Sequence, residues 1–313
     1  MSTLAAIEAG GSKFVCAVTS ESGQTLVERR IPTTTPDETL ERLGAFFKEA
    51  RAAHGAVLAA GIASFGPLDL DTSSATYGAI TGSPKPGWSG VNLQSRVKSM
   101  LGVPVAINTD VVCAAIAEGV SGMARGLDSY AYVTVGTGIG VGVVSHGQPL
   151  AGHQHTEVGH IRVARPHSDL EFAGVCPFHH DCVEGLASGP AIEARWSAQA
   201  KDLPDGHPAW ALEAEYIAAL CLNLVYTVRP QRVIVGGGVF QRAALFPLVR
   251  RAFSRLHGDY ALGRWERSES FIAPQGCAGG VPGLLGAVEL AKRLALPGPA
   301  RAAGATSPAP ARR

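Results

Sequence analysis

The 313-residue chain has almost no excess of charge of either sign. It carries 27 Lys and Arg against 26 Asp and Glu, for a formal net charge of +1. A nucleic-acid-binding domain normally shows a basic face or stripe, whereas here only scattered arginines occur, such as Arg250 and Arg251. The composition therefore argues against nucleic acid as a partner, and equally against a membrane surface.

The chain also lacks a long uninterrupted hydrophobic run. Its first residues, MSTLAAIEAGG, have no basic segment followed by an apolar core, and its most apolar stretch, residues 132–144, is broken by four glycines. The six cysteines are scattered, with no secretion signal that would favour a disulfide framework. We expect a cytoplasmic protein.

Three sequence motifs are missing. There is no G-x-x-x-x-G-K-[ST] loop, and no glycine fingerprint with a suitably spaced acid follows the first strand, which argues against P-loop and Rossmann nucleotide sites. There is no H-E-x-x-H, the motif of many zinc hydrolases. Any phosphate chemistry must therefore use a different scaffold.

Two similar glycine hairpins are present. Residues 5–18 read AAIEAGGSKFVCAV and residues 132–144 read YVTVGTGIGVGVV, each a strand, a glycine turn and a second strand. Glycine permits positive φ in tight turns, and a turn without side chains lets backbone N–H groups approach a phosphate. Either hairpin alone is equally well read as a surface turn, but together they could clamp one polyphosphate.

The segments after each hairpin alternate between strand and helix patterns, which suggests an internally duplicated α/β protein. The expected elements are helices at 37–53 and 111–120 and strands at 58–64 and 103–107 after the first hairpin, then helices at 188–199, 208–228 and 283–294 and a strand at 232–235 after the second. The length favours two domains. We assign these to residues 1–119, completed by helix 283–295, and to residues 120–282, with a disordered tail at 296–313 that is rich in Pro, Ala and Gly.

Asp110 lies where an expected strand passes into a helix, in the segment VAINTDVVCAAIAE. Asp is a preferred helix N-cap, and on position alone capping is the better interpretation. However, ligands of open α/β sheets bind beyond the carboxyl ends of strands, where Asp110 lies. A carboxylate there can accept a hydroxyl proton as the hydroxyl attacks a γ-phosphate.

A second group of polar residues has the composition of a metal site. His153, His155, Glu157 and His160 are followed by Cys176, His179, His180 and Cys182. Zinc prefers tetrahedral sulfur and nitrogen ligands, so His160, Cys176, His179 and Cys182 would close a site, leaving His180 spare. The alternative is a loop with incidental histidines. Four protein ligands leave no position for a catalytic water, so we predict structural zinc.

These motifs together resemble the ROK family of sugar kinases and repressors, part of the sugar kinase, heat-shock and actin superfamily, and within it the bacterial fructokinases. EAGGSKF, VTVGTGIGVG and IVGGGV resemble the two phosphate motifs and the adenosine motif, and EVGH resembles the signature before the zinc loop. YGAITGSPKPGW and CPFHHDCVEGLASGPA are similar to the fructokinase branch. The resemblance spans about residues 6–295. It implies two RNase H-like domains of the actin and hexokinase type flanking a cleft.

The resemblance also implies roles for particular residues. Asp110 would be the general base, Glu157, His160 and Glu184 would bind the sugar, and His160 would also ligate zinc. The MgATP-binding residues would be Gly10, Gly11, Ser12, Lys13, Gly136, Thr137, Gly138, Pro190, Gly236, Gly237 and Gly238. The family further implies Mg²⁺ with ATP, closure of the domains around a hexose, and a homodimer.

Some positions depart from the family's usual pattern. Thr109 and Val112 replace the asparagines that many relatives carry beside the base, and His179 stands where most members use cysteine, as in the fructokinase branch. We expect an ATP-dependent fructokinase, with a kinase of glucose or mannose as the alternative. A sugar-responsive repressor is disfavoured because the first hairpin begins too early for a DNA-binding segment. A sugar-binding protein without catalysis would be expected to lack Asp110, which is present.

Overall fold

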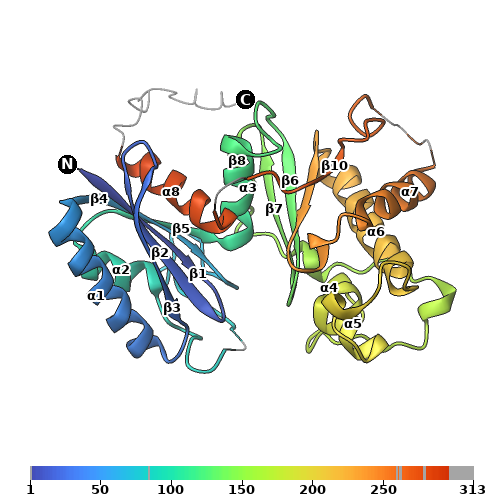
Figure 1. Ribbon diagram of the computed structural model, residues 1–313, viewed down its shortest axis with the longest axis horizontal. Helices are drawn as coiled ribbons and strands as arrows, with labels where there is room; N and C mark the ends of the chain where they lie inside the picture. The colour runs from blue at the N-terminus through green and yellow to red at the C-terminus, as the bar shows by residue number, and fades with distance from the viewer. Residues whose placement is uncertain (1, 84, 259, 261–262, 278–279, 296–313) are drawn as a thin grey trace, which may run out of the picture.

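Two five-stranded sheets lie side by side in the computed structural model, which describes residues 2–295 except residues 84, 259, 261–262 and 278–279 (Figure 1). The first sheet has the order β3-β2-β1-β4-β5, and the second has the order β10-β9-β6-β7-β8. Read from its other edge, the second sheet repeats the first strand for strand. The predicted duplication of an α/β unit is confirmed. The tail at 296–313 lies outside the described residues.

The first sheet is built around a buried hairpin. Its strands are β1 (Thr3–Ala9), β2 (Lys13–Ser20), β3 (Thr25–Pro32), β4 (Val57–Ser64) and β5 (Val105–Thr109). β1 and β2 pair antiparallel, and β4 and β5 continue the sheet parallel to β1. β1 and β4 are almost continuous runs of small apolar residues, because both of their faces are covered. β3 is a largely exposed edge strand with a polar sequence.

The second sheet repeats this arrangement with shorter edge strands. Its strands are β6 (Tyr130–Val135), β7 (Ile139–Ser145), β8 (Gln148–Pro149), β9 (Val233–Gly236) and β10 (Ile272–Pro274). β6 and β7 form the antiparallel hairpin, and β9 and β10 are parallel to β6. The glycine turns of the two hairpins therefore occupy equivalent positions in the two sheets.

Helices cover the outer faces of both sheets. The α-helices are α1 (Pro36–His54), α2 (Leu93–Leu101), α3 (Asp110–Ser121), α4 (Val183–Ala187), α5 (Gly189–Trp196), α6 (Ala209–Val228), α7 (Leu245–His257) and α8 (Pro282–Ala295), with 3₁₀ turns η1 (Val158–His160), η2 (His167–Asp169), η3 (Ala200–Asp202) and η4 (Val239–Gln241). Apolar residues of α1 and α2 share a core with the first sheet, and those of α4, α6 and α7 share one with the second.

Two helices each pack against the sheet of the other half of the molecule. α8 follows the second sheet but packs on β1 and β4 of the first, and α3 follows β5 but packs on β6 and β7 (Figure 1). The two helices meet where a Cβ on Gly286 would lie 1.9 Å from the carbonyl oxygen of Cys113, so only glycine fits this contact. The contact between α3 and α8 therefore joins the two halves of the molecule.

α6 is, within the described part of the chain, the single helix that is long and apolar enough to cross a bilayer. Trp210, Ile217 and Leu224 on this helix are buried in the core beneath the second sheet. Packing inside the protein therefore accounts for its apolar sequence, and a membrane protein is not indicated.

The predicted elements are present, with corrections at their ends. The strand expected at 103–107 is Val105–Thr109, and the helix expected at 188–199 ends at Trp196, where Ser197 adopts a left-handed conformation. The edge strands β3, β8 and β10 and the helices α2, α4 and α7 were not predicted.

Candidate active site between the two sheets

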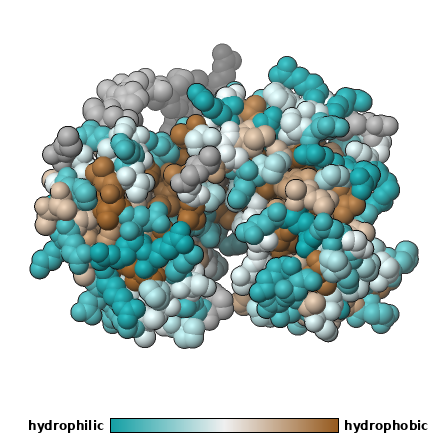
Figure 2. All heavy atoms as spheres, viewed as in Figure 1, coloured by the Kyte–Doolittle hydropathy of each residue, from teal (hydrophilic) through white to brown (hydrophobic). Residues whose placement is uncertain are grey.

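A cavity of about 270 Å³ lies between the two halves. Glu8 and Asp110 line it from the first half, and Tyr132, Gly237 and Gly238 line it from the second. The space-filling view shows a groove between the halves on the face drawn there (Figure 2). The cavity brings the candidate base and two glycines of the predicted adenosine motif into one space.

Asp110 is the first residue of α3, directly after β5. The N-cap is Thr109, whose Oγ1 accepts the N–H of Val112 at 3.3 Å. Asp110 Oδ1 accepts the N–H of Val111 at 2.8 Å. Because Thr109 caps the helix, the interpretation of Asp110 as the N-cap is wrong, and the carboxylate of Asp110 faces the cavity.

The environment of Asp110 favours a carboxyl group that titrates near neutral pH. Burial raises its pKa to about 6, opposed by the hydrogen bond from Val111 and reinforced by the nearby charge of Glu157. A base whose pKa lies close to the working pH is well placed for proton transfer. Val112 of α3, which replaces an asparagine of the resemblance, is buried, while Val111 lines the cavity.

Glu8 is a second carboxylate of the cavity, and sequence reasoning missed it. Burial raises its pKa to about 7, and the charge of Asp110 adds to the rise. Its Oε2 is buried without a hydrogen-bond partner among the described residues. The available signal was its position, one residue from the end of β1 and just before the Gly10-Gly11 turn.

The first glycine turn is held mainly by its own backbone. The N–H of Gly10 donates to the carbonyl of Lys13 at 3.0 Å, and Thr33 Oγ1 donates to the carbonyl of Gly10 at 2.7 Å. Gly11, Ser12 and Lys13 are exposed and do not line the cavity. A Cβ on Gly11 would meet nothing within 4 Å.

The second glycine turn is tied to another segment of the chain. The N–H of Ile139 donates to Glu184 Oε2 at 2.9 Å, and the N–H of Gly189 donates to the carbonyl of Gly136 at 2.7 Å. A Cβ on Gly138 would lie 2.6 Å from Glu184 Oε2. Gly136 in turn lies close to the backbone of Gly238. The second turn is therefore adjacent to the cavity and fixed by α4 and α5.

Of the two reasons that we gave for glycine in these turns, positive φ is wrong. Neither Gly10 and Gly11 nor Gly136 and Gly138 have positive φ. Gly138 instead leaves space for the carboxylate of Glu184. Gly140 and Gly142, later in the same motif, make room for Val111 of α3.

The remaining glycines of the nucleotide motifs, Gly236, Gly237 and Gly238, lie at the end of β9 and directly after it. Gly237 does have positive φ, +91°, and a Cβ there would collide with the backbone of Val135. Gly236 ends β9, and a Cβ on Gly238 would meet nothing within 4 Å. Pro190 lies in the first turn of α5, next to Gly189, on the side where α5 meets the second hairpin.

The three predicted sugar ligands belong to a connected chain of contacts in the second half. Glu157 precedes η1, and its carbonyl accepts the N–H of His160 at 3.0 Å. His160 Nε2 lies 4.0 Å from Glu184 Oε1. Since Glu184 also bonds the second hairpin, these side chains link that hairpin to η1. The cavity lining does not include them.

His160, Cys176, His179 and Cys182 converge as predicted. Their ligand atoms all lie within 4.8 Å of one another. His160 Nδ1 is 3.3 Å from His179 Nδ1 and 3.5 Å from Cys182 Sγ, and Cys176 Sγ is 3.7 Å from His179 Nδ1. A tetrahedral zinc would set such N–N pairs about 3.3 Å apart and N–S pairs about 3.6 Å apart. The four side chains therefore fit the ion.

The other histidines of that group do different things. His180 forms the turn of the loop through its backbone, with positive φ, and does not join the four ligand atoms. His153 and His155 face the loop after β4, 3.7 Å from Asp71 Oδ2 and 2.9 Å from the N–H of Leu68 respectively.

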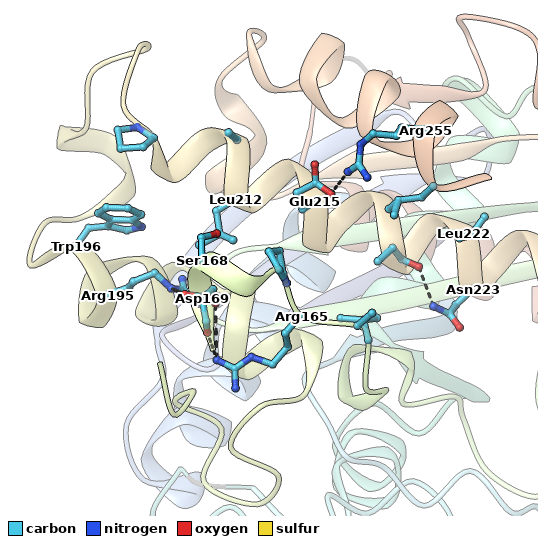
Figure 3. Close-up of a pocket in the computed structure, with 17 residues that line it drawn as sticks. Arg165, Ser168, Asp169, Arg195, Trp196, Leu212, Glu215, Leu222, Asn223 and Arg255 are labelled. Atoms are coloured by element: carbon cyan, nitrogen blue, oxygen red, sulfur yellow. Dashed lines mark hydrogen bonds and ion pairs between the residues drawn. The ribbon is translucent and has the colours of Figure 1, made fainter. Parts of the chain in front are cut away.

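A larger cavity, of about 830 Å³, runs along α6 and contains none of the predicted site residues (Figure 3). Its charged groups are paired with each other: Asp169 with Arg195 at 2.8 Å, and Glu215 with Arg255. Most of the other lining residues are apolar. The smaller cavity is the better candidate for chemistry, because it holds two carboxylates with raised pKa values rather than neutralised ion pairs.

Comparisons with known proteins find similarity over nearly the whole chain. The sequence profile of the ROK family matches residues 4–293. A fructokinase of Pediococcus pentosaceus is 39% identical over 289 residues, 92% of this chain and 97% of that protein. A fructokinase of Zymomonas mobilis is 40% identical over 288 residues, 91% and 95% of the two chains. A ROK family glucokinase from Streptomyces griseus, solved with glucose and AMPPNP, matches with a TM-score of 0.72 at 25% identity, covering 93% of this chain and 99% of that one.

Proposed function

This chain belongs to the ROK family, and we propose that it phosphorylates fructose at the 6-hydroxyl with ATP as the donor. The observation that carries the proposal is the carboxylate of Asp110, which faces the cavity between the two sheets with its pKa raised to about 6. The fructokinase names of relatives about 40% identical over most of the chain support fructose as the hexose.

In this proposal Asp110 is the general base. Its carboxylate takes the proton of the sugar 6-hydroxyl while that oxygen attacks the γ-phosphorus in line, and the bond to the β-phosphate oxygen breaks to release ADP. The proton remains on Asp110 until solvent removes it after the products leave. Closure of the two halves would exclude water that would otherwise hydrolyse ATP.

The phosphates of ATP are assigned to the two glycine turns. Gly10, Gly11, Ser12 and Lys13 would approach them from the first half, and Gly136, Thr137 and Gly138 from the second. Backbone N–H groups without side chains suit close approach to phosphate oxygens. The adenosine is assigned to Gly236, Gly237 and Gly238, with Pro190 nearby. The adjacency of Gly136 and Gly238 supports one continuous nucleotide site.

Mg²⁺ is expected to accompany the nucleotide, and the residues of the cavity suit a cation. Two carboxylates with raised pKa values lie together, and one oxygen of Glu8 is buried without a partner among the described residues. Glu8 would therefore face the ion, directly or through its water, as hard cations prefer oxygen ligands. Bound there, Mg²⁺ would neutralise charge on the phosphates.

We assign sugar binding to Glu157, His160 and Glu184, and zinc binding to His160, Cys176, His179 and Cys182. Zinc with four protein ligands is closed to water and acts by fixing structure. Cys182 is the residue immediately before α4, which carries Glu184 in its first turn. The ion would thus hold Glu184 in place between the sugar site and the second hairpin.

The test is ADP release measured with fructose, glucose and mannose at equal concentrations. We expect the highest kcat/KM with fructose. Equal or higher turnover of glucose would overturn the assignment of the hexose, and no ADP release with any of them would overturn the kinase. The homodimer implied by the family stays a prediction. Size-exclusion chromatography with light scattering would check it by measuring the mass of the protein in solution.

A further inference from the structure

One side chain of the second half lies in the first half's loop after β4. His155 comes from the segment before η1, and its side chain is only 8% exposed. Its Nε2 lies 2.9 Å from the backbone nitrogen of Leu68. The site residues that we assign to catalysis and to sugar binding come from these two halves, so a contact between them bears on how the residues are placed.

The Leu68 contact fixes the tautomer of His155. A backbone N–H can only donate a hydrogen bond, so Nε2 must be the unprotonated, accepting nitrogen. The proton of the neutral imidazole is then on Nδ1, which becomes a donor. Nδ1 lies 3.3 Å from Oε1 of Glu157. The imidazole therefore accepts a hydrogen bond from the first half and holds its Nδ1 proton close to a predicted sugar ligand of the second.

The neighbouring residue strengthens the same contact. Gln154 Oε1 accepts the N–H of Leu70 at 2.9 Å, and its Nε2 donates to Asp69 Oδ1 at 3.1 Å. Asp69 is buried and also accepts bonds from Ser74 and Thr76. The side chains of Gln154 and His155 thus accept hydrogen bonds from the backbone N–H groups of Leu70 and Leu68, which lie in one loop of the first half. The position of His155 is set by the first half rather than by its own segment.

Glu157 has little else to hold its carboxylate. The side chain is 52% exposed, and among the described residues the close polar contact of its carboxylate is that with His155 Nδ1, at 3.3 Å. A half-exposed glutamate has several rotamers, and holding one of them before ligand binding lowers the entropy cost of recognition. The charge of Glu157 also reaches Asp110, so the two carboxylates lie near each other.

We propose that His155 is a positioning residue that orients Glu157 toward the sugar, and that it does so by binding the Leu68 amide of the opposite half. The inference rests on the proposed function, in which Glu157 binds the hexose. Sugar recognition is then coupled to the relative placement of the two halves. His155 acts through Glu157, without contact with the reacting atoms.

Two conservative variants separate this role from a merely structural one. His155→Gln places a carbonyl oxygen near the position of Nε2, which keeps the Leu68 bond but removes the donor to Glu157. His155→Asn places an amide nitrogen near Nδ1, which keeps that donor but loses the Leu68 bond. We expect KM for fructose to rise about tenfold in His155→Gln and about threefold in His155→Asn. A tenfold change corresponds roughly to the loss of one interaction with a charged group, and a threefold change to less than that.

Other kinetic constants should move little. KM for ATP should stay within about twofold and kcat within about threefold, because uniform binding of the sugar is what is lost. If His155 only fastens the loop, His155→Asn should be the more damaging variant, and that reversed order would overturn the proposal. His153→Ala is the matched control, since His153 is 80% exposed and 3.7 Å from Asp71; its constants should equal those of the wild type.

A measurement without substrate keeps the inference separable from the proposed function. Long-range ¹⁵N–¹H NMR of the intact protein should show His155 with its proton on Nδ1. Glu157→Gln should change the ¹⁵N chemical shift of Nδ1. A proton on Nε2, or no response to Glu157→Gln, would overturn the positioning role. If the wild type phosphorylates no hexose, the kinase proposal fails while these NMR signals still decide the His155–Glu157 contact.

Discussion

The two glycine turns occupy equivalent places in equivalent sheets, yet they are held in different ways. The first turn, residues 10–13, is bonded to itself and to Thr33 and is largely exposed. The second, residues 136–138, is flanked by bonds from Ile139 to Glu184 and from Gly189 to Gly136. The segment that supplies these partners begins just after Cys182 of the metal cluster. The second turn is therefore coupled to the metal loop, and the first is not.

The same asymmetry divides the chemistry. Both carboxylates of the cavity, Glu8 and Asp110, come from the first half, whereas the metal cluster and the predicted sugar ligands come from the second. Duplication of the sheet accounts for the cleft, because each copy presents the same end to it. What differs is where each copy carries its polar residues: the first in β1 and at the start of α3, the second in the segment between β8 and α5. The comparison teaches that the two halves share a scaffold and contribute different functions.

The strongest test of this division is Asp110→Asn. The amide keeps the size and an accepting oxygen for Val111 but cannot take a proton, so kcat should fall about a thousandfold, within the usual range for loss of a general base. The melting temperature should not fall, because a buried charge is removed. Asp128→Asn, at an exposed position, is the matched control. Near-normal turnover of Asp110→Asn would mean that Asp110 is not the base.

Removal of the metal should affect one turn and spare the other. The wild type should contain about one zinc per chain, and Cys182→Ser should lose most of it because a tetrahedral site needs all four ligands. Hydrogen exchange should then speed up at residues 136–139 and stay unchanged at residues 10–13. Cys277→Ser, a cysteine outside the cluster, should retain both the zinc and the slow exchange. Equal changes in the two turns would contradict the coupling.

A matched pair of glycine substitutions sharpens the comparison further. Gly138→Ala should cost about 2 kcal/mol of unfolding free energy, because the new methyl group displaces Glu184 from its charge-assisted bond with Ile139. Gly11→Ala should change stability by less than about 0.5 kcal/mol, since a Cβ there meets nothing. Urea denaturation measures both.

The origin of the Gly138 effect can be isolated with a second variant. In a Glu184→Ala background the carboxylate is absent, so Gly138→Ala should lose most of its cost. An unchanged cost in that background would show that the crowding comes from elsewhere than Glu184.

The fold could be predicted where the sequence alternates between strongly apolar runs and glycine turns. Strands such as β1 and β4 are buried on both faces, so their composition alone identifies them. β3 was missed because an exposed edge strand does not need apolar residues; its sequence, TLVERRIP, carries no burial pattern. α7 was missed because Pro247 lies in its first turn. Proline is tolerated there, but in a sequence it indicates the end of a helix.

The candidate site was predictable where chemistry restricts residue type. Four sulfur and nitrogen ligands at short spacing identified the metal cluster, which needs no tertiary information beyond one loop. Glu8 could not be found this way, because a single glutamate in a strand gains meaning only when the fold sets it beside Asp110. The reason for Gly138 was likewise invisible, since it depends on a carboxylate 46 residues away.

The smallest expected effect concerns pH and the carboxylates of the first half. Burial raises the pKa of Glu8 to about 7 and of Asp110 to about 6, so between about pH 4 and 7 the folded protein holds protons that the unfolded chain releases. Stability therefore falls as pH rises through this window and levels off above it. The melting temperature of the ligand-free protein should drop by a few degrees from pH 5 to pH 8, and Mg²⁺ with a nucleotide should reduce the drop. Glu8→Gln should make the melting temperature depend less on pH, whereas Glu41→Gln on the exposed side of α1 should not. If the two variants show the same pH dependence, protonation of Glu8 does not contribute to it.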